Sequence, residues 1–567
     1  MAWKSNLNPQ FRSKFSEDIF NLKYKHEGAE TWSVLAKLLV KDVCGDLRTG
    51  EYKMMSDDEL DRLENYINEL KFVPGGRYLY YAGRKNRYYN NCFLLKAEED
   101  TREDWAALAW RAESCLMTGG GIGVDYSVYR AAGAPLKGTG GTASGPIPAM
   151  KLINSIGANV MQGGSRRSAI YASLNWQHGD IPAFLRAKDW DSMPVGNTGQ
   201  TLKDIKEADF NFPAPLDMTN ISVNYDTEWL MQYWKTGDVG DVFRQNVRQA
   251  LRTAEPGFSF NFFDKENETL RNACTEVTSE RDSDVCNLAS INMGRVQSLE
   301  EFSDIVELGT KFLICGTLRA HLPYQKVYDV REATRRLGLG LMGMHEWLIK
   351  NGHRYECVPE LHKWLEIYRG VSDKTSREFA DSLSISRPVA NRAIAPTGSI
   401  GILAGTTTGV EPLFAVAYKR RYLTGGTRWK YQYVVDSAAQ ELIDMYGVEP
   451  ESIESALDLA ENYERRMAFQ ADVQDYVDMS ISSTINLPSW GSKLNNEDTV
   501  DSFADTLARY APRLRGFTCY PDGARGGQPL SVVPYSEAVD RLGTEFDEHI
   551  ETHDICEISG QGGSCGV

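Results

Sequence analysis

Near the start of the chain, apolar residues recur at three- and four-residue spacing, a pattern that predicts amphipathic helices. The stretches ETWSVLAKLLVKDVCG (30–45) and DDELDRLENYINELKF (57–72) both show this spacing. PGGRYL, which begins at Pro74, then breaks the pattern. We therefore expect a helical N-terminal segment over residues 1–75.

From about residue 76 the pattern changes to short apolar runs separated by glycine-rich turns and helical stretches. NNCFLLKA (90–97) and GGGIGVDYSV (119–128) have the character of strands, and TREDWAALAWRAESCLM (101–117) between them has that of a helix. Such alternation is typical of βα units. It predicts an α/β fold, and we expect one large barrel over residues 76–535.

Several later stretches extend this prediction. CNLASINM (286–293) is strand-like, residues 331–350 and 450–475 are predicted to be helical, and a late strand is predicted at GFTCYP (516–521). The chain ends in CEISGQGGSCGV, a glycine-rich sequence that is typical of flexible segments. We therefore expect a mobile C-terminal tail over residues 536–567.

The overall composition narrows the class of protein. Hydrophobic residues make up 42% and charged residues 25% of the chain, as in ordinary globular proteins. No apolar run approaches the roughly 20 residues of a membrane span, and the first residues lack the apolar core of a signal peptide. We therefore expect a cytoplasmic protein. The net charge of −16 argues against binding to nucleic acid, which requires clustered Lys and Arg.

Ten cysteines are scattered along the chain without any CxxC pair. This distribution matches neither a disulfide scaffold nor the usual zinc spacings, so we expect no protein-bound metal site. One segment, Asn272-Ala273-Cys274-Thr275-Glu276, combines an amide, a thiol and a carboxylate. If it is extended, residues two apart share a face, and Asn272, Cys274 and Glu276 would project together as a reaction centre.

At this point the chain resembles the catalytic subunit of ribonucleotide reductases, most closely the adenosylcobalamin-dependent class. The resemblance rests on many short segments in the family's order: PGGR (74–77), NNCF (90–93), GGGIGV (119–124), GTASGP (141–146), QGGSRRSA (162–169), NISV (220–223), EPGF (255–258), NACTE (272–276), CNLASIN (286–292), RRLGLGLMG (335–343) and APTGSI (395–400). It implies a ten-stranded α/β barrel with a central finger loop. The implied activity is deoxyribonucleotide synthesis, which supplies DNA replication.

The resemblance also implies a role for each residue of the reaction centre. Cys274 would sit at the loop tip and become a thiyl radical that abstracts the 3′ hydrogen of the ribose. Glu276 would accept the proton of the 3′ hydroxyl, and Asn272 would hydrogen-bond the substrate. Cys92 and Cys286 would face each other and reduce C2′, ending as a disulfide. A dithiol that becomes a disulfide supplies the two electrons and two protons that this reduction needs.

Further residues match the family's binding segments. The tail cysteines Cys556 and Cys565 resemble its redox shuttle, which takes electrons from a thioredoxin-like reductant, although they lie farther apart than the usual pair. The loop Pro396, Thr397, Gly398, Ser399 and Ile400 resembles the substrate-phosphate loop, whose backbone N–H groups and hydroxyls can hold oxyanions. Asn91 and Gly121 would line the same pocket.

Residues 130–141 and 159–169 resemble two regulatory loops that sense a deoxyribonucleoside triphosphate or ATP effector. Asp100, Arg130 and Arg166 are the expected effector contacts. Because this effector site normally lies at a dimer interface, we expect a homodimer. The resemblance leaves open whether the substrate is a ribonucleoside diphosphate or triphosphate.

The resemblance leaves two radical sources open. Oxygen-dependent relatives use a ferritin-like partner subunit and two adjacent tyrosines in a late strand, where this chain has Cys519 and Tyr520. That substitution and the segment YPDGARGGQPL favour adenosylcobalamin as the cofactor. A remote alternative is an NAD-dependent dehydrogenase, since residues 338–343 fit GxGxxG, but no apolar strand is expected before them. A catalytically silent nucleotide-binding regulator with the same fold is the non-enzymatic alternative.

Overall fold

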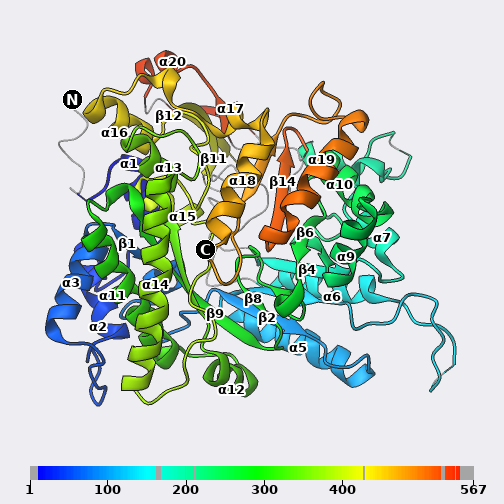
Figure 1. Ribbon diagram of the computed structural model, residues 1–567, viewed down its shortest axis with the longest axis horizontal. Coiled ribbons are helices and arrows are strands. Elements are labelled where there is room, and N and C mark those ends of the chain that lie inside the picture. The colour runs from blue at the N-terminus through cyan, green and yellow to red at the C-terminus, as the bar shows by residue number, and fades with distance from the viewer. Residues whose placement is uncertain are drawn as a thin grey trace.

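A computed structural model describes residues 10–138, 140–160, 168–197, 199–208, 212–424, 428–524, 530–542 and 545–549. At its centre lies a ten-stranded sheet (Figure 1). In hydrogen-bonded order its strands are β1 (Phe72–Pro74), β9 (Asp284–Asn292), β2 (Cys92–Lys96), β3 (Gly121–Asp125), β4 (Ile170–Asn175), β5 (Thr219–Tyr225), β6 (Gly257–Phe260), β14 (Gly516–Pro521) and β13 (Thr484–Leu487), with β10 (Leu337–Met342) paired to β9.

The sheet closes into a barrel made of two halves. Strands β2 to β6 are parallel, and the antiparallel pairs β2–β9 and β6–β14 join them to the other half. Bridges between Leu339 and Arg392 and between Ile394 and Ile481 then connect β10 to the segment that leads into β13. This ring confirms the expected ten-stranded α/β barrel.

Helices cover the barrel on opposite sides (Figure 1). One side carries α2 (Trp32–Val43), α3 (Asp57–Asn68), α11 (Leu299–Arg319) and α14 (Pro359–Ser382). The other carries α5 (Arg102–Met117), α6 (Pro146–Asn159), α7 (Ile181–Leu185), α9 (Thr227–Thr236), α10 (Asp241–Thr253) and α19 (Val500–Tyr510). Helix α18 (Tyr463–Gln474) lies between the two sides and packs into the apolar cores of both (Figure 1). Each side has its own apolar core, and a third cluster fills the barrel interior. Burial on both faces agrees with the nearly continuous apolar sequences of β2 (CFLLK) and β10 (LGLGLM).

The remaining helices and strands lie at the ends of the barrel and in its connections. The helices are α1 (Lys14–Lys23), α4 (Gly76–Tyr81), α8 (Leu202–Ala208), α12 (Gln325–Thr334), α13 (Met344–Lys350), α15 (Gly398–Ala404), α16 (Ser437–Tyr446), α17 (Ala456–Ala460) and α20 (Tyr535–Asp540). A second, four-stranded sheet has the order β15 (Leu530–Val532), β11 (Ala417–Thr424), β12 (Arg428–Val435) and β16 (Glu545–His549). Strands β7 (Leu270–Arg271) and β8 (Thr278–Ser279) form a two-stranded pair.

The N-terminal segment is helical, as predicted, but it is not a separate layer. Its helices end at Asn68, and β1 already pairs with β9, so the barrel sheet begins slightly before residue 75. Local chemistry explains one helix start, because Ser56 and Glu59 form a capping box at α3. Trp32 in α2 is fully buried and packs against Phe20 of α1, which joins the three helices in one core.

Two predictions from periodicity were wrong. Residues 331–350 form the end of α12, strand β10 and helix α13 rather than one helix, and residues 450–475 contain two separate helices. Gly338 and Gly340 therefore lie inside a strand, not in the strand-to-helix turn of a dinucleotide-binding loop. Close packing explains why residue 340 is glycine, because a Cβ there would lie 2.7 Å from the carbonyl oxygen of Ala393.

The segment expected to be a tail is partly folded. Helix α20 starts at Tyr535 and extends into this segment, and strand β16, which follows at residues 545–549, pairs with β12. Cys556 and Cys565 lie outside the described residues. Among the helices that the structure describes, each is too short or too polar to cross a lipid bilayer.

The N-terminal core should contribute strongly to stability. We expect Trp32→Ala to lower the free energy of unfolding by about 3–5 kcal/mol, because it opens a cavity and removes the hydrogen bond from Nε1 to the Ile67 carbonyl oxygen. Urea unfolding followed by circular dichroism measures this change. Met231→Ala, at a position 51% exposed on α9, is the control and should change stability by less than about 0.5 kcal/mol. If both changes lowered the free energy of unfolding equally, Trp32 would not be a central part of the N-terminal core.

Candidate active site

A short loop between β7 and β8 carries the three residues expected to form the reaction centre. Residues 272–276 form a turn in which the Thr275 N–H donates to the Asn272 carbonyl oxygen at 3.0 Å. Thr275 has a φ of +71°, and the Asn272 side chain accepts from the Val277 N–H at 3.0 Å. The segment is therefore not extended, because these hydrogen bonds fold the chain back on itself, and the condition under which Asn272, Cys274 and Glu276 would share one face of a strand is not met. The turn forms the finger loop.

The finger loop is held against the barrel wall by a contact that requires glycine. A Cβ on Gly123 of β3 would lie only 1.6 Å from the Arg271 carbonyl oxygen, so a side chain there cannot fit. Arg271 is buried and donates from Nη2 to Asn261 Oδ1 at 2.7 Å and to the Arg515 carbonyl oxygen at 3.1 Å. These contacts tie the base of the loop to β3 and to the paired ends of β6 and β14.

The structure brings the three expected active-site cysteines together inside the barrel. In the antiparallel pair β2–β9, Cys92 lies directly opposite Cys286. Such pairs hold Cβ atoms about 4.5–5.5 Å apart, close to the spacing that a disulfide needs. Cys274 belongs to the same buried apolar cluster. Gly338 of β10 leaves room for this pair, since a Cβ there would lie 3.2 Å from Cys286 Sγ.

Glu276 and Asn272 contact Cys92, one member of this cysteine pair. Asn272 Nδ2 donates to Cys92 Sγ at 3.0 Å, and the Cys92 thiol lies 3.9 Å from Glu276 Oε1. Glu276 is fully buried, and this burial raises the pKa of its carboxyl to about 7. A carboxylate with a pKa near neutrality is suited to act as a general base.

Burial has a related effect on the thiols. It raises the pKa of both Cys92 and Cys286 well above the ordinary value, and the neighbouring Glu276 carboxylate adds to the effect. Both groups are therefore protonated at neutral pH. A protonated thiol can donate a hydrogen atom, whereas a thiolate can donate only electrons. The site is thus arranged for hydrogen-atom chemistry and dithiol oxidation.

A small cavity of about 50 Å³ adjoins Cys274. Thr484 of β13 and Thr518 of β14 line it, and their hydroxyl oxygens lie 3.0 Å apart. Cys519 and Tyr520, the two residues at the place of the family's tyrosine pair, also border it. The structure therefore places this late strand beside the loop tip.

The expected phosphate loop has a tight local geometry. Thr397 has a φ of +51°, its Oγ1 accepts from the Gly409 N–H at 2.8 Å, and α15 starts directly after it. Asn91 and Gly121 lie on the finger-loop side of the barrel: the Gly121 N–H donates to the Asn91 carbonyl oxygen, and a Cβ on Gly121 would lie 3.2 Å from Ala273 Cβ.

Two of the expected effector residues contact each other. The Arg130 guanidinium and backbone N–H both donate to Asp100 Oδ2. Trp105 Nε1 donates to the other carboxylate oxygen at 3.1 Å. Asp100 and Arg130 are partly exposed, at 19% and 40% of their side chains, so the pair lies at the surface. Arg166 lies outside the described residues.

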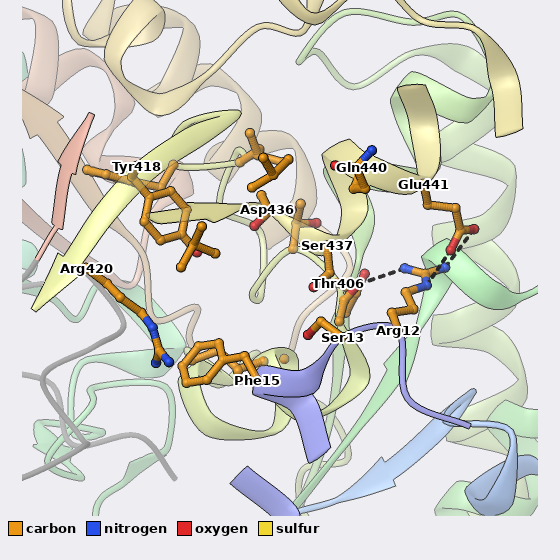
Figure 2. Close-up of a pocket in the computed structure, with 18 of the residues that line it drawn as sticks. Arg12, Ser13, Phe15, Thr406, Tyr418, Arg420, Asp436, Ser437, Gln440 and Glu441 are labelled. Atoms are coloured by element: carbon orange, nitrogen blue, oxygen red, sulfur yellow. Dashed lines mark hydrogen bonds and ion pairs between the residues drawn. The ribbon is translucent and has the colours of Figure 1, made fainter. Parts of the chain in front are cut away.

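A second cavity, of about 1110 Å³, lies between α1, α16 and the β11–β12 hairpin. Figure 2 shows Arg12 on one side of it, paired with Glu441, and Arg420 directed toward Phe15 on the other. Asn486 of β13 lines this cavity, while Thr484 of the same strand lines the cavity at Cys274. Since residues two apart in a strand point to one face, both cavities border the same face of β13.

Reasoning from the sequence missed the residues that hold the finger loop. Gly123 belongs to the quoted GGGIGV segment, but only its closeness to Arg271 shows why glycine stands there. Arg271 directly precedes Asn272, yet nothing in its spacing indicates that it is fully buried. The sequence also did not indicate the large cavity, because the residues that line it come from segments far apart in the chain.

Comparisons with known proteins agree with this geometry. The family described as "Ribonucleotide reductase, barrel domain" matches residues 90–207, 217–371 and 389–514. A vitamin B12-dependent ribonucleoside-diphosphate reductase of Mycobacterium tuberculosis is 26% identical over 86% of this chain and 74% of its own length. A ribonucleoside-diphosphate reductase subunit alpha of Chlamydia muridarum is 25% identical over 50% of this chain and 31% of its own.

Among solved structures, the class Id ribonucleotide reductase alpha subunit of Actinobacillus ureae has a similar fold. Its TM-score is 0.67 at 16% identity, with 90% of this chain and 97% of that chain covered. Together with the family match, which spans most of the barrel, this identifies the class of enzyme. The chain belongs to the ribonucleotide reductase family and is a ribonucleotide reductase.

The contact at Gly123 makes the finger loop sensitive to a single methyl group. We expect Gly123→Ala to lower the rate of ribonucleotide reduction by about 100-fold or more, because a displacement of about 1 Å misaligns reacting groups. Turnover and thermal unfolding should both be measured. Gly370→Ala is the matched control, since a Cβ on Gly370 of α14 meets nothing within 4 Å. Full activity of Gly123→Ala would show that the loop tolerates displacement.

Proposed function

We propose that this chain reduces ribonucleotides to 2′-deoxyribonucleotides with a thiyl radical at Cys274, generated from adenosylcobalamin. The observation that carries the proposal is the placement of Cys92 opposite Cys286 in the same enclosed cluster as Cys274. Replacing a hydroxyl by hydrogen needs two electrons and two protons, and starting the reaction needs a separate radical. Three thiols in one dry compartment meet both needs.

In the proposed reaction, Cys274 loses its thiol hydrogen atom and abstracts the 3′ hydrogen of the ribose. Glu276 accepts the proton of the 3′ hydroxyl, and Asn272 orients the substrate by hydrogen bonding. The 2′ hydroxyl leaves as water with a proton from the cysteine pair. Cys92 and Cys286 supply the two electrons, form a disulfide and leave hydrogen at C2′. Cys274 then returns hydrogen to C3′ and recovers the radical, and Glu276 returns its proton to the 3′ oxygen.

The large cavity in Figure 2 fits a bulky cofactor that is rich in amides. Phe15, Phe414 and Tyr418 offer flat apolar surface, and Gln432 and Gln440 offer amide groups for hydrogen bonds. Adenosylcobalamin, when bound, supplies a radical through cleavage of its cobalt–carbon bond. The shared face of β13 would place these residues next to the cavity of Cys274.

The relatives support this cofactor over the alternative. The Mycobacterium tuberculosis enzyme is named as vitamin B12-dependent and matches over most of both chains, whereas the chlamydial alpha subunit matches over half of this one. Cys519 also stands where a radical relay of two tyrosines would need the first tyrosine. A radical supplied by a separate ferritin-like subunit remains the second candidate.

The other expectations from the resemblance complete the proposal. Residues 396–400, with Asn91 and Gly121, bind the substrate. Asp100, Arg130 and Arg166 bind a deoxyribonucleoside triphosphate or ATP effector in a homodimer. Cys556 and Cys565 pass electrons from a thioredoxin-like reductant to the oxidised pair. The enzyme acts in the cytoplasm. The exposed Asp100–Arg130 pair, where two strands of the barrel end, suits contact with a ligand or a second subunit.

A single-turnover experiment tests this function. Prereduced enzyme is mixed anaerobically with CDP or CTP and effector nucleotides, with or without adenosylcobalamin and without added reductant. We expect a stoichiometric amount of deoxynucleotide only when adenosylcobalamin is present. Mass spectrometry of peptides should then show a Cys92–Cys286 disulfide, or a Cys556–Cys565 disulfide after exchange.

Two serine variants sharpen this test. Cys286→Ser should form no deoxynucleotide, because the substrate cannot receive its second electron. Cys357→Ser, at a partly exposed thiol outside the site, should react like the unchanged enzyme. Turnover without adenosylcobalamin but with a metal-containing partner subunit would overturn the cofactor assignment and leave the cysteine roles in place.

The pH dependence follows from the pKa of Glu276. Because burial raises this pKa to about 7 and the base must be ionised, kcat/KM should fall about tenfold per pH unit below about pH 7. A pH profile of CDP reduction at saturating effector concentration measures this fall in kcat/KM. Glu276→Gln should abolish this dependence of kcat/KM on pH and lower kcat by about 100-fold or more. A fall in kcat/KM that begins only near pH 4.5 would show that the carboxyl of Glu276 is solvated during turnover.

A further inference from the structure

We propose that Lys23, at the end of helix α1, binds the terminal phosphate of the ribonucleotide substrate. This assignment rests on the proposed function of residues 396–400 as the phosphate loop. It adds a residue from the N-terminal helical segment, which neither the motifs nor the matched part of the family includes. The argument uses the contacts of Lys23, the packing of α1 and the charge of the loop.

Lys23 directly contacts the phosphate loop. Its Nζ donates to Ser399 Oγ at 3.0 Å. Ser399 is buried, with 7% of its surface exposed, and Lys23 is partly buried. An ammonium group carries three N–H donors, so it can hold Ser399 and a phosphate oxygen at the same time.

The position of Lys23 is set by a rigid contact between two helices. Arg12 Nη1 donates to the Gly405 carbonyl oxygen at 2.7 Å, and Ser16 Oγ donates to that of Ile402 at 2.6 Å. Together with the contact of Lys23 to Ser399, these bonds show that α1 runs antiparallel to α15. The last residue of α1 therefore lies at the end of α15 where the phosphate loop begins. Buried Ile19 and Phe20 anchor α1 in the N-terminal core.

The loop itself lacks the charge that a polyphosphate needs. Residues 393–410 read AIAPTGSIGILAGTTTGV and contain no Lys or Arg. Hydroxyls and backbone N–H groups can orient phosphate oxygens, but a cation is needed to balance their charge. Lysine serves this purpose as a point charge on a long side chain. Lys23 brings such a charge to the loop from more than 370 positions earlier in the chain.

Binding measurements on the full-length enzyme test the assignment. Lys23→Met keeps much of the side-chain volume but removes the charge. We expect it to weaken the binding of labelled CDP and CTP by about tenfold or more, with a similar rise in KM and little change in kcat. Inhibition by cytidine, which has no phosphate, should stay unchanged. Lys23→Arg should restore most of the lost affinity.

Lys25→Met is the matched control. Lys25 lies two positions away, carries the same charge and is exposed, so this variant should bind nucleotides like the unchanged enzyme. Thermal unfolding of each variant separates a loss of phosphate binding from a loss of structure. The nucleotide whose binding suffers more from Lys23→Met identifies whether the second or the third phosphate meets Lys23.

Three results would overturn the assignment. These are unchanged CDP and CTP binding by Lys23→Met, an equal loss for cytidine, or no recovery in Lys23→Arg. A failure of the proposed function gives a different result: the unchanged enzyme would bind CDP but form no deoxynucleotide with adenosylcobalamin. In that case Lys23 is still judged by binding alone.

Discussion

The antiparallel pairing of β2 with β9 is the constraint on which the rest of the site depends. It joins the two halves of the barrel and places Cys92 opposite Cys286. Because strand side chains alternate between faces, a slip of one residue would turn one thiol out of the barrel. The neighbouring pairs β2–β3 and β9–β10 hold this register on both sides, and Gly338 lets β10 approach the pair closely.

Enclosure then sets the chemistry of the groups that this register brings together. The barrel interior keeps the thiols protonated and brings Glu276 near neutrality, so burial prepares hydrogen-atom transfer and proton transfer together. It would also keep water away from the radical that we propose at Cys274. The finger loop reaches this interior only because Gly123 leaves space for its backbone. The same close packing that protects the site therefore limits which residues can surround it.

The N-terminal helices contact both the proposed phosphate loop and the large cavity proposed for the cofactor. Helix α1 lies along α15, where Lys23 contacts the phosphate loop and Arg12 reaches the buried carboxylate of Glu346. Phe15 of the same helix lines the large cavity. A segment that has only an amphipathic pattern in the sequence thus borders both regions that we propose to bind ligands.

The sequence alone determined the α/β class and the helical N-terminal segment, and it singled out the residues that we propose to react, because motif order and residue chemistry are local properties. It also placed the strands β2, β3, β9 and β14 in roughly the right positions. Only the tertiary structure decided that residues 337–342 form a strand, since an apolar, glycine-containing run suits a strand or a helix until its neighbours are known. The turn at Asn272–Glu276 is held by hydrogen bonds within residues 272–277, but the sequence pattern did not indicate it. The contact of Gly123 with Arg271 and the position of Lys23 beside Ser399 depend on segments that are distant in the chain, so no local pattern could predict them.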